Sequence, residues 1–304
     1  MTVVTIQQFI DEAYRDHAAG PAAVAVRLAD GFAMLSAAPD QAEAFARLAE
    51  HVVLGHLGDS AQLDQWIARL EPLAAARDDG LGVALARARL ANALSRGAVM
   101  SGREALPVAD RVRAYGNALL AMTRRSAWAE IRSGLASAQQ LADVAGDDAS
   151  LRSFAAITNN LAGDLRFYLA AHRDDVGYAQ LMIGAARLAH TAWYRAGSWL
   201  ERERADYQLA LCLAAVGVAE EAIAAADACW QGCIDNGADD EECFYALEAI
   251  AHARCAAGQL AEARTAQSEM LERMARWDEP SRSFAAPQVA ALADAIKALE
   301  TEVA

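Results

Sequence analysis

The sequence predicts an all-α protein: a solenoid of about six antiparallel helical hairpins with a capping helix at each end. Alanine, the best helix former, makes up much of a composition that is 55% hydrophobic, and the 304 residues include only six prolines. A short phrase also recurs every 40 to 47 residues. This period is typical of stacked hairpins, since one hairpin cannot bury its own apolar face and needs neighbours.

The recurring phrase is a small or helix-breaking residue followed by a helix that begins near Glu and a small residue. Each copy is predicted to open the second helix of a hairpin. The copies are Pro39 with Glu43-Ala44, Ser126 with Trp128-Ala129-Glu130-Ile131, Gly217 with Glu221-Ala222, and Gly258 with Glu262-Ala263.

Breaking residues divide the chain into predicted helices of about 15 to 22 residues. A capping helix at 5–19 ends at Gly20-Pro21 and forms an N-terminal segment, 1–20. The hairpin array covers 21–277, and a C-terminal segment, 278–304, carries a second capping helix at 285–303 after Asp278-Glu279-Pro280. The predicted hairpins pair 21–38 with 40–57, 59–77 with 80–97, 103–125 with 126–145, 149–171 with 174–197, 198–216 with 218–236, and 239–257 with 259–277.

Glycines and aspartates supply the physical signals for these boundaries. Glycine can adopt the left-handed conformation that closes a helix, and aspartate can cap the next helix and suits its positive end. Pro72 and Pro107 fall inside predicted helices and predict kinks or breaks there. The boundary within 97–107 is left open. The closing glycines are Gly58, Gly97, Gly217, Gly237 and Gly258, and the capping pairs are Asp147-Asp148, Asp174-Asp175 and Asp239-Asp240.

Several of these segments resemble tetratricopeptide repeats. Asn159-Asn160-Leu161-Ala162 is similar to the first-helix phrase of the subgroup seen in kinesin light chains and many bacterial regulators. The resemblance covers most of 21–277 and implies a right-handed superhelix. The period exceeds the family's 34 residues, and aromatic positions often hold Ala or Leu, so another α-solenoid is the alternative. The residues that follow the family's order are Leu209-Ala210, Leu213, Gly217, Glu221-Ala222, Ala226 and Cys229, then Ile250-Ala251, Gly258, Glu262-Ala263 and Met270.

In that family the first helices line a concave groove that holds a peptide or a helix. Asparagine would offer a donor and an acceptor to a peptide backbone, and arginine could bind a carboxylate through two parallel hydrogen bonds. The alternative is that these side chains are solvated or bonded locally. The resemblance places these candidates on the groove face: Asn117, Asn159, Asn160, Arg166, Arg204, Tyr207, Glu248 and His252.

The net charge and the number of cysteines limit the kinds of binding partner and the cellular compartment that the sequence predicts. The net charge of −14 argues against nucleic acid, whose phosphates repel such a surface. We see no secretory signal, and the longest apolar run, 209–219, is too short to span a bilayer. Five cysteines, an odd number, predict a reduced, cytoplasmic protein.

The sequence offers few signs of metal or catalytic chemistry. All five cysteines lie within 212–255 but lack a Cys-x-x-Cys pair, and free cysteine usually behaves as a small hydrophobe. His51 and His56 would lie about 140° apart around an α-helix, too far to ligate one ion easily. No nucleophile elbow, phosphate loop or dinucleotide motif is found. We therefore expect no metal, no cofactor and no catalytic residue.

Two further groups of residues, one aromatic and one charged, are explained by structure without a binding partner. Trp193, Tyr194 and Trp199 are more readily explained by packing between hairpins than by a partner anchor. The run Glu201-Arg202-Glu203-Arg204 is predicted to be a solvated face with neighbouring ion pairs.

The predicted function is binding of a protein or peptide without catalysis. The alternatives are a sensor of a small molecule or signalling peptide that acts through a partner protein, and an enzyme with an unrecognised helical active site. The two capping helices could also pair between copies, which would give a homodimer.

Overall fold

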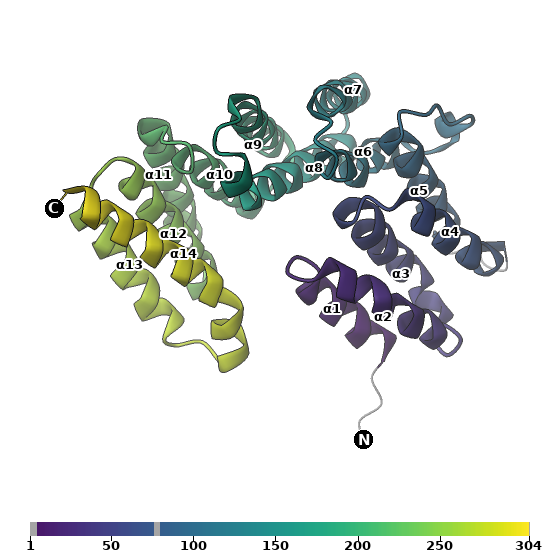
Figure 1. The fold of residues 1–304 in the computed structure, drawn as a ribbon, viewed down its shortest axis with the longest axis horizontal. Helices are drawn as coiled ribbons and strands as arrows, with labels where there is room; N and C mark the ends of the chain where they lie inside the picture. Colours follow the sequence, from purple (N-terminus) through teal and green to yellow (C-terminus); the bar gives the residue numbers. More distant parts are fainter. Residues whose placement is uncertain (1–4, 76–79, 304) are drawn as a thin grey trace. The chain divides into compact units, whose positions relative to one another are not determined.

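The computed structural model describes residues 5–75 and 80–303. Over these residues the chain forms fourteen α-helices and no strand, which confirms the all-α class (Figure 1). The contacts divide the chain into two compact units, Met1–Ile157 and Thr158–Ala304, with the boundary inside α8 (Asp148–Phe167).

Within its described residues, the first unit contains seven complete α-helices and a π-helical stretch, η2 (Glu50–His56), that continues α3. Two short 3-10 turns, η1 (Pro39–Gln41) and η3 (Arg103–Ala105), connect helices. The helices are α1 (Ile6–Asp16), α2 (Pro21–Met34), α3 (Ala42–Ala49), α4 (Ser60–Ala75), α5 (Leu81–Ser95), α6 (Val108–Thr123) and α7 (Trp128–Ala145).

Aromatic rings form the centre of the first unit's core. Phe45 is fully buried, and its ring lies 5.7 Å from Trp66 and 6.2 Å from Phe32. The Arg69 guanidinium lies 4.3 Å from the centres of the Phe32 and Trp66 rings, where the negative ring faces attract it. These contacts join α2, α3 and α4.

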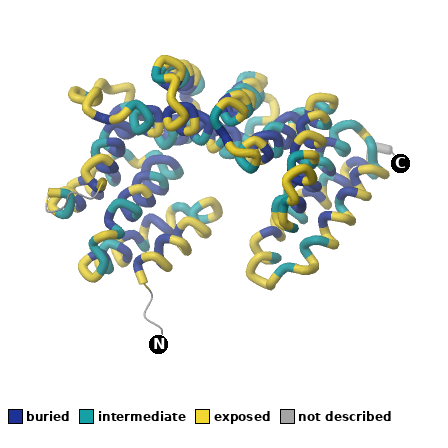
Figure 2. The backbone as a smooth tube through the Cα atoms, turned by 180° about the vertical axis from the view of Figure 1, so that it is seen from behind, coloured by how far each residue is buried: buried dark blue, intermediate teal, exposed yellow. Residues whose placement is uncertain are grey.

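In the described part of the second unit, six α-helices and one 3-10 turn, η4 (Leu169–His172), follow α8. Helix α10 packs on α11, α12 packs on α13, and α10 also contacts α12. Buried residues lie where neighbouring helices meet, while the turns are largely exposed (Figure 2). The helices are α9 (Val176–Ala196), α10 (Trp199–Ala214), α11 (Ala219–Asn236), α12 (Asp240–Ala256), α13 (Leu260–Met274) and α14 (Glu279–Val303).

The predicted caps are confirmed in the second half of the chain. The Asp175 side chain accepts a hydrogen bond of 3.0 Å from the Tyr178 amide at the start of α9. Asp239 accepts from the amides of Glu241 and Glu242, at 3.0 Å each, and begins α12. Gly237 closes α11 with φ of 61°, a conformation that glycine adopts without the penalty of a Cβ.

Proline positions correct two predicted boundaries. Helix α6 begins at Val108, not at 103, because Pro107 is the residue before the first turn and follows a separate 3-10 turn. Helix α14 begins at Glu279, six residues earlier than predicted, because Pro280 lies in its first turn, where a missing N–H costs nothing. Pro72 lies inside α4, near its C-terminal end.

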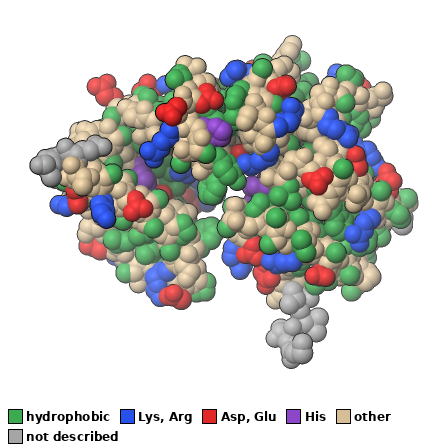
Figure 3. Space-filling model, viewed as in Figure 1, with side chains coloured by type: hydrophobic (Ala, Val, Ile, Leu, Met, Phe, Trp, Pro, Cys, Tyr) green, Lys and Arg blue, Asp and Glu red, His purple; other side chains and the backbone are tan. Residues whose placement is uncertain are grey.

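Charged side chains of both signs are interspersed over the face seen in Figure 3. Among the described residues many charged side chains form ion pairs, as Arg264 does with Glu300 and Arg187 with Glu221. Within the described residues, no helix combines the length and the apolar character that crossing a membrane requires.

Candidate functional site

Four of the predicted groove residues come together inside the second unit: Arg166 from α8, Tyr207 from α10, and Glu248 and His252 from α12. We call this set the inner polar cluster. The Tyr207 hydroxyl donates a hydrogen bond of 2.8 Å to Glu248 Oε2. His252 Nε2 lies 4.0 Å from Glu248 Oε1. Three helices, α8, α10 and α12, therefore contribute to one polar site.

Burial dominates the electrostatics of the inner polar cluster. Glu248 is only 3% exposed, and burial raises its pKa despite the Tyr207 hydrogen bond and the positive charge of Arg166. Burial and then Arg166 lower the pKa of His252 to about 4, which leaves this imidazole neutral at pH 7. Arg166 thus acts on its neighbours as the fixed positive charge of the cluster.

Two polar atoms on α8 are buried without a hydrogen-bond partner among the described residues. They are Arg166 Nε and Asn159 Oδ1. Because the two residues are seven positions apart, they lie on the same face of the helix, two turns from one another. An unpartnered buried polar atom costs about 1–3 kcal/mol, so two of them on one face call for an explanation.

The remaining predicted groove residues lie outside this cluster. Asn160 is exposed on α8. The Arg204 side chain is 59% exposed and pairs with Glu242 at the start of α12. Its neighbour Glu203 is only 2% exposed, so the prediction of a solvated charge run is wrong at this position. Glu203 Oε1 instead accepts a bond of 2.9 Å from the buried Cys229 thiol.

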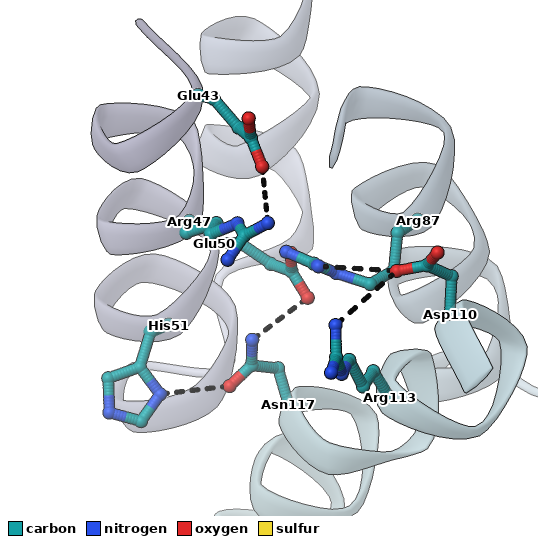
Figure 4. Close-up of polar contacts among 8 residues, drawn as sticks. All are labelled: Glu43, Arg47, Glu50, His51, Arg87, Asp110, Arg113 and Asn117. Carbon is teal, nitrogen blue, oxygen red and sulfur yellow. Dashed lines mark hydrogen bonds and ion pairs between the residues drawn. The ribbon is translucent and has the colours of Figure 1, made fainter. Parts of the chain in front are cut away.

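Asn117 belongs to a separate polar network in the first unit (Figure 4). Asn117 Nδ2 donates to Glu50 Oε1 at 2.8 Å, and Asn117 Oδ1 lies 2.9 Å from His51 Nδ1. Glu50 is 1% exposed, and its Oε2 accepts from Arg87 at 3.2 Å. Arg87 also lies 3.7 Å from Asp110. The sequence did not reveal this network, because Glu50 and Asn117 are far apart along the chain.

His51 and His56 face one another, contrary to the sequence prediction. Their Nε2 atoms lie 3.2 Å apart. The predicted separation of 140° assumed an α-helix, but residues 50–56 are π-helical. A π-helix bonds residue i to residue i+5, so positions five apart lie close together on one face.

A pocket of about 430 Å³ lies between α5, α6 and α7 of the first unit. Its wall includes the Arg111 side chain, whose Nε is buried without a hydrogen-bond partner in the described part of the chain. The pocket combines aliphatic, arginine and amide side chains, a composition suited to an amphipathic ligand. Its lining residues are Leu90, Leu94, Arg103, Arg111, Tyr115, Ser137, Gln140, Leu141 and Val144.

The aromatic group at the α9–α10 junction has mixed exposure. Tyr194 is 44% exposed and Trp199 38% exposed. The Tyr194 hydroxyl donates to Asp206 Oδ2 at 2.7 Å, and His190 Nε2 lies 2.9 Å from Asp206 Oδ1. These contacts attach the end of α9 to α10, consistent with packing between helices.

No protein-family model matches the sequence, and no similar curated protein is found. The resemblance to tetratricopeptide repeats therefore stays a prediction that depends on the residues quoted above.

Proposed function

We propose that this chain is a non-catalytic binding protein whose inner polar cluster holds a carboxylate-bearing segment of a peptide or protein. In this proposal the hairpins form a right-handed solenoid of tetratricopeptide type, with about six repeats, and the first helices present the binding face. The observation that carries the proposal is the pair of unpartnered buried atoms on α8, Arg166 Nε and Asn159 Oδ1.

A peptide would satisfy both atoms. A guanidinium binds a carboxylate through parallel hydrogen bonds from two nitrogens, and Arg166 Nε is free to supply one of them. The Asn159 carbonyl oxygen can accept from a peptide N–H. Because both groups are already desolvated, part of the cost of binding is met in the free protein.

The neighbouring residues favour binding over acid–base catalysis. Glu248 is held by the Tyr207 hydroxyl, and His252 has a pKa of about 4, far from the value near 7 that suits a general base. The five free cysteines suit the cytoplasmic location in this proposal.

The test is selection of peptides from a display library, followed by fluorescence polarisation with the selected peptides. Arg166→Ala and Asn159→Ala should each weaken binding at least tenfold, because each removes a desolvated partner. Arg264→Ala is the matched control, since Arg264 lies in the same unit but already pairs with Glu300 at the surface.

Replacing each peptide carboxylate by an amide identifies the group that Arg166 binds. The critical amide should lose as much affinity as Arg166→Ala, and combining the two changes should cost little more. Peptides that bind both α8 variants as tightly as the wild type would overturn the proposal.

A second candidate function is binding of a small amphipathic anion in the pocket of the first unit. It is favoured by the unpartnered Arg111 Nε beside aliphatic walls. Octanoate should then raise the melting temperature of the wild type and have no effect on Arg111→Ala, because ligand binding to the native state stabilises it. Octylamine, which has the same chain and the opposite charge, is the control; an equal shift with octylamine would contradict this candidate.

A further inference from the structure

We propose that His17, His51 and His56 form a binding site for a divalent transition-metal ion, with Zn²⁺ as the best fit. This departs from the sequence expectation of no metal. The three residues belong to the first unit and form the one group of potential metal ligands, among the described residues, whose donor atoms all lie within 4.8 Å of one another. The proposal is independent of the peptide site, which lies in the other unit.

The three rings surround a common point. Their centroids are separated by 4.9 Å for His17 and His51, 4.8 Å for His17 and His56, and 4.7 Å for His51 and His56. His51 Nε2 and His56 Nε2 are 3.2 Å apart. Two nitrogens bound to one tetrahedral Zn²⁺ at about 2.05 Å would be roughly 3.3 Å apart, so this pair already has the required spacing. His17 would become the third ligand after a change in its side-chain conformation that brings its ring nitrogen closer to the ion.

Hydrogen bonds at Nδ1 orient two of the rings. The Glu50 carboxylate accepts from Asn117 and cannot donate, so Asn117 must turn its Nδ2 towards Glu50 and its Oδ1 towards His51. His51 Nδ1 therefore carries the proton, and the lone pair is on Nε2. His17 Nδ1 likewise lies 2.5 Å from the Tyr14 carbonyl, which only accepts, so the lone pair of His17 is also on Nε2.

This arrangement is the outer-shell pattern of histidine metal sites, in which the second ring nitrogen donates to a carbonyl or a carboxylate-linked group. In Figure 4, Asn117 lies between His51 and the buried Glu50. Arg87 holds the other oxygen of Glu50, which completes the support behind the His51 ring.

The local backbone also favours the close approach of His51 and His56. The π-helical turn brings His56 under His51, and such turns occur frequently at functional sites. Gly55 lies inside that turn, and a Cβ there would come within 2.9 Å of Asn117 Oδ1. A glycine at this position therefore lets the supporting amide reach His51.

Three imidazoles leave the fourth position of a tetrahedral ion open. Borderline divalent ions such as Zn²⁺ and Co²⁺ prefer imidazole nitrogen, whereas Mg²⁺ and Ca²⁺ prefer oxygen. The three side chains are only partly buried, so water or a small anion can reach the open position. We therefore expect Zn²⁺ and Co²⁺ to bind and Mg²⁺ not to bind.

The experiment is titration of the full chain with Co²⁺, monitored by the visible absorption of the four-coordinate ion, followed by displacement with Zn²⁺. The wild type should bind one Co²⁺, and His17→Ala, His51→Gln and His56→Gln should each weaken binding at least 100-fold. Asn117→Ala should weaken it by about 10- to 100-fold at unchanged stoichiometry. His190→Ala, which removes a histidine bonded to Asp206 in the other unit, should bind as the wild type does.

Two results would overturn the proposal. One is absence of the absorption band in the wild type at millimolar Co²⁺. The other is unchanged binding in all three histidine variants, which would assign the ion to the cysteines of the second unit. Metal-free circular dichroism melts identify any variant that fails to fold, and the wild-type titration still decides the question.

Discussion

Glu203 is a buried acidic residue in a run of charged residues that the sequence predicted to be solvated. Its neighbours Arg202 and Arg204 are exposed, while Glu203 itself lies beside Cys229 and Cys233. Burial raises the pKa of Glu203 to about 7, although the Cys229 thiol donates to it and works in the opposite direction. Its Oε2 has no partner in the described structure. The charged form is therefore destabilised in the folded chain.

The resulting pH dependence can be predicted with its sign. The folded pKa exceeds the ordinary value of 4.5, so the folded state binds more protons between these two values. The contribution of Glu203 to stability is complete below pH 4.5 and is lost as pH rises through 7. Glu203→Gln should remove this loss and stabilise the protein at pH 8 by about 1–3 kcal/mol relative to its effect at pH 5. Urea unfolding at both pH values measures the difference; an equal effect at both would contradict the assignment.

Cysteines of the second unit contribute to its core. Cys229, Cys233 and Cys243 are buried, and burial raises the pKa of the Cys229 and Cys233 thiols. Raised thiol pKa values disfavour the thiolate, which is the reactive form. Only packing shows that the Glu203 side chain, which extends from α10, receives both thiols: Glu203 Oε1 lies 2.9 Å from Cys229 Sγ and 3.7 Å from Cys233 Sγ.

Among the elements, the π-helical stretch η2 has the largest effect on the arrangement of polar side chains in the first unit. It continues α3 after Ala49, and it buries Glu50 and Gly55 while directing His51 and His56 to the same side. Asn117 on α6 bonds both Glu50 and His51. A contact between α6 and η2 therefore accompanies the change from i→i+4 to i→i+5 geometry.

Gly55→Ala tests how tightly this element packs. The new Cβ would lie 2.9 Å from Asn117 Oδ1, and Asn117 cannot retreat without losing its bonds to Glu50 and His51. We expect a net destabilisation of about 1–3 kcal/mol, despite the higher helix propensity of alanine. Urea unfolding provides the measurement.

The matched control is Gly82→Ala in α5, where a Cβ would meet no atom within 4 Å. That change should stabilise the protein by up to about 1 kcal/mol, since alanine is the better helix former. Equal stability of the two variants would show that η2 is not tightly packed against α6.

Over the whole chain, most helices could be predicted because their signals are local. Asp175 and Asp239 cap helices through backbone amides two or three residues away, and Gly237 needs only its own backbone freedom to close α11. Apolar residues at helical spacing then predict which face is buried. The family resemblance also predicted that Arg166, Tyr207, Glu248 and His252 line one groove, and that assignment stays a prediction.

The repeat pattern could not predict which of these polar residues find partners. Glu248 bonds Tyr207 from 41 positions away, while Asn159 Oδ1 and Arg166 Nε have no partner in the described structure. Both outcomes depend on how α8, α10 and α12 approach one another. Spacing along one helix contains no information about that approach.

Local chemistry in the chain thus settled where helices begin, end and turn their apolar faces, because those choices depend on hydrogen bonds and side chains only a few residues apart. Tertiary packing decided the π-helical geometry of η2, the burial of Glu203, and the meeting of His51 with Asn117 across 66 positions. The physical reason is the distance along the chain over which hydrogen bonds form. A helix forms its backbone hydrogen bonds within about one turn, whereas these buried polar side chains form theirs with residues of another helix.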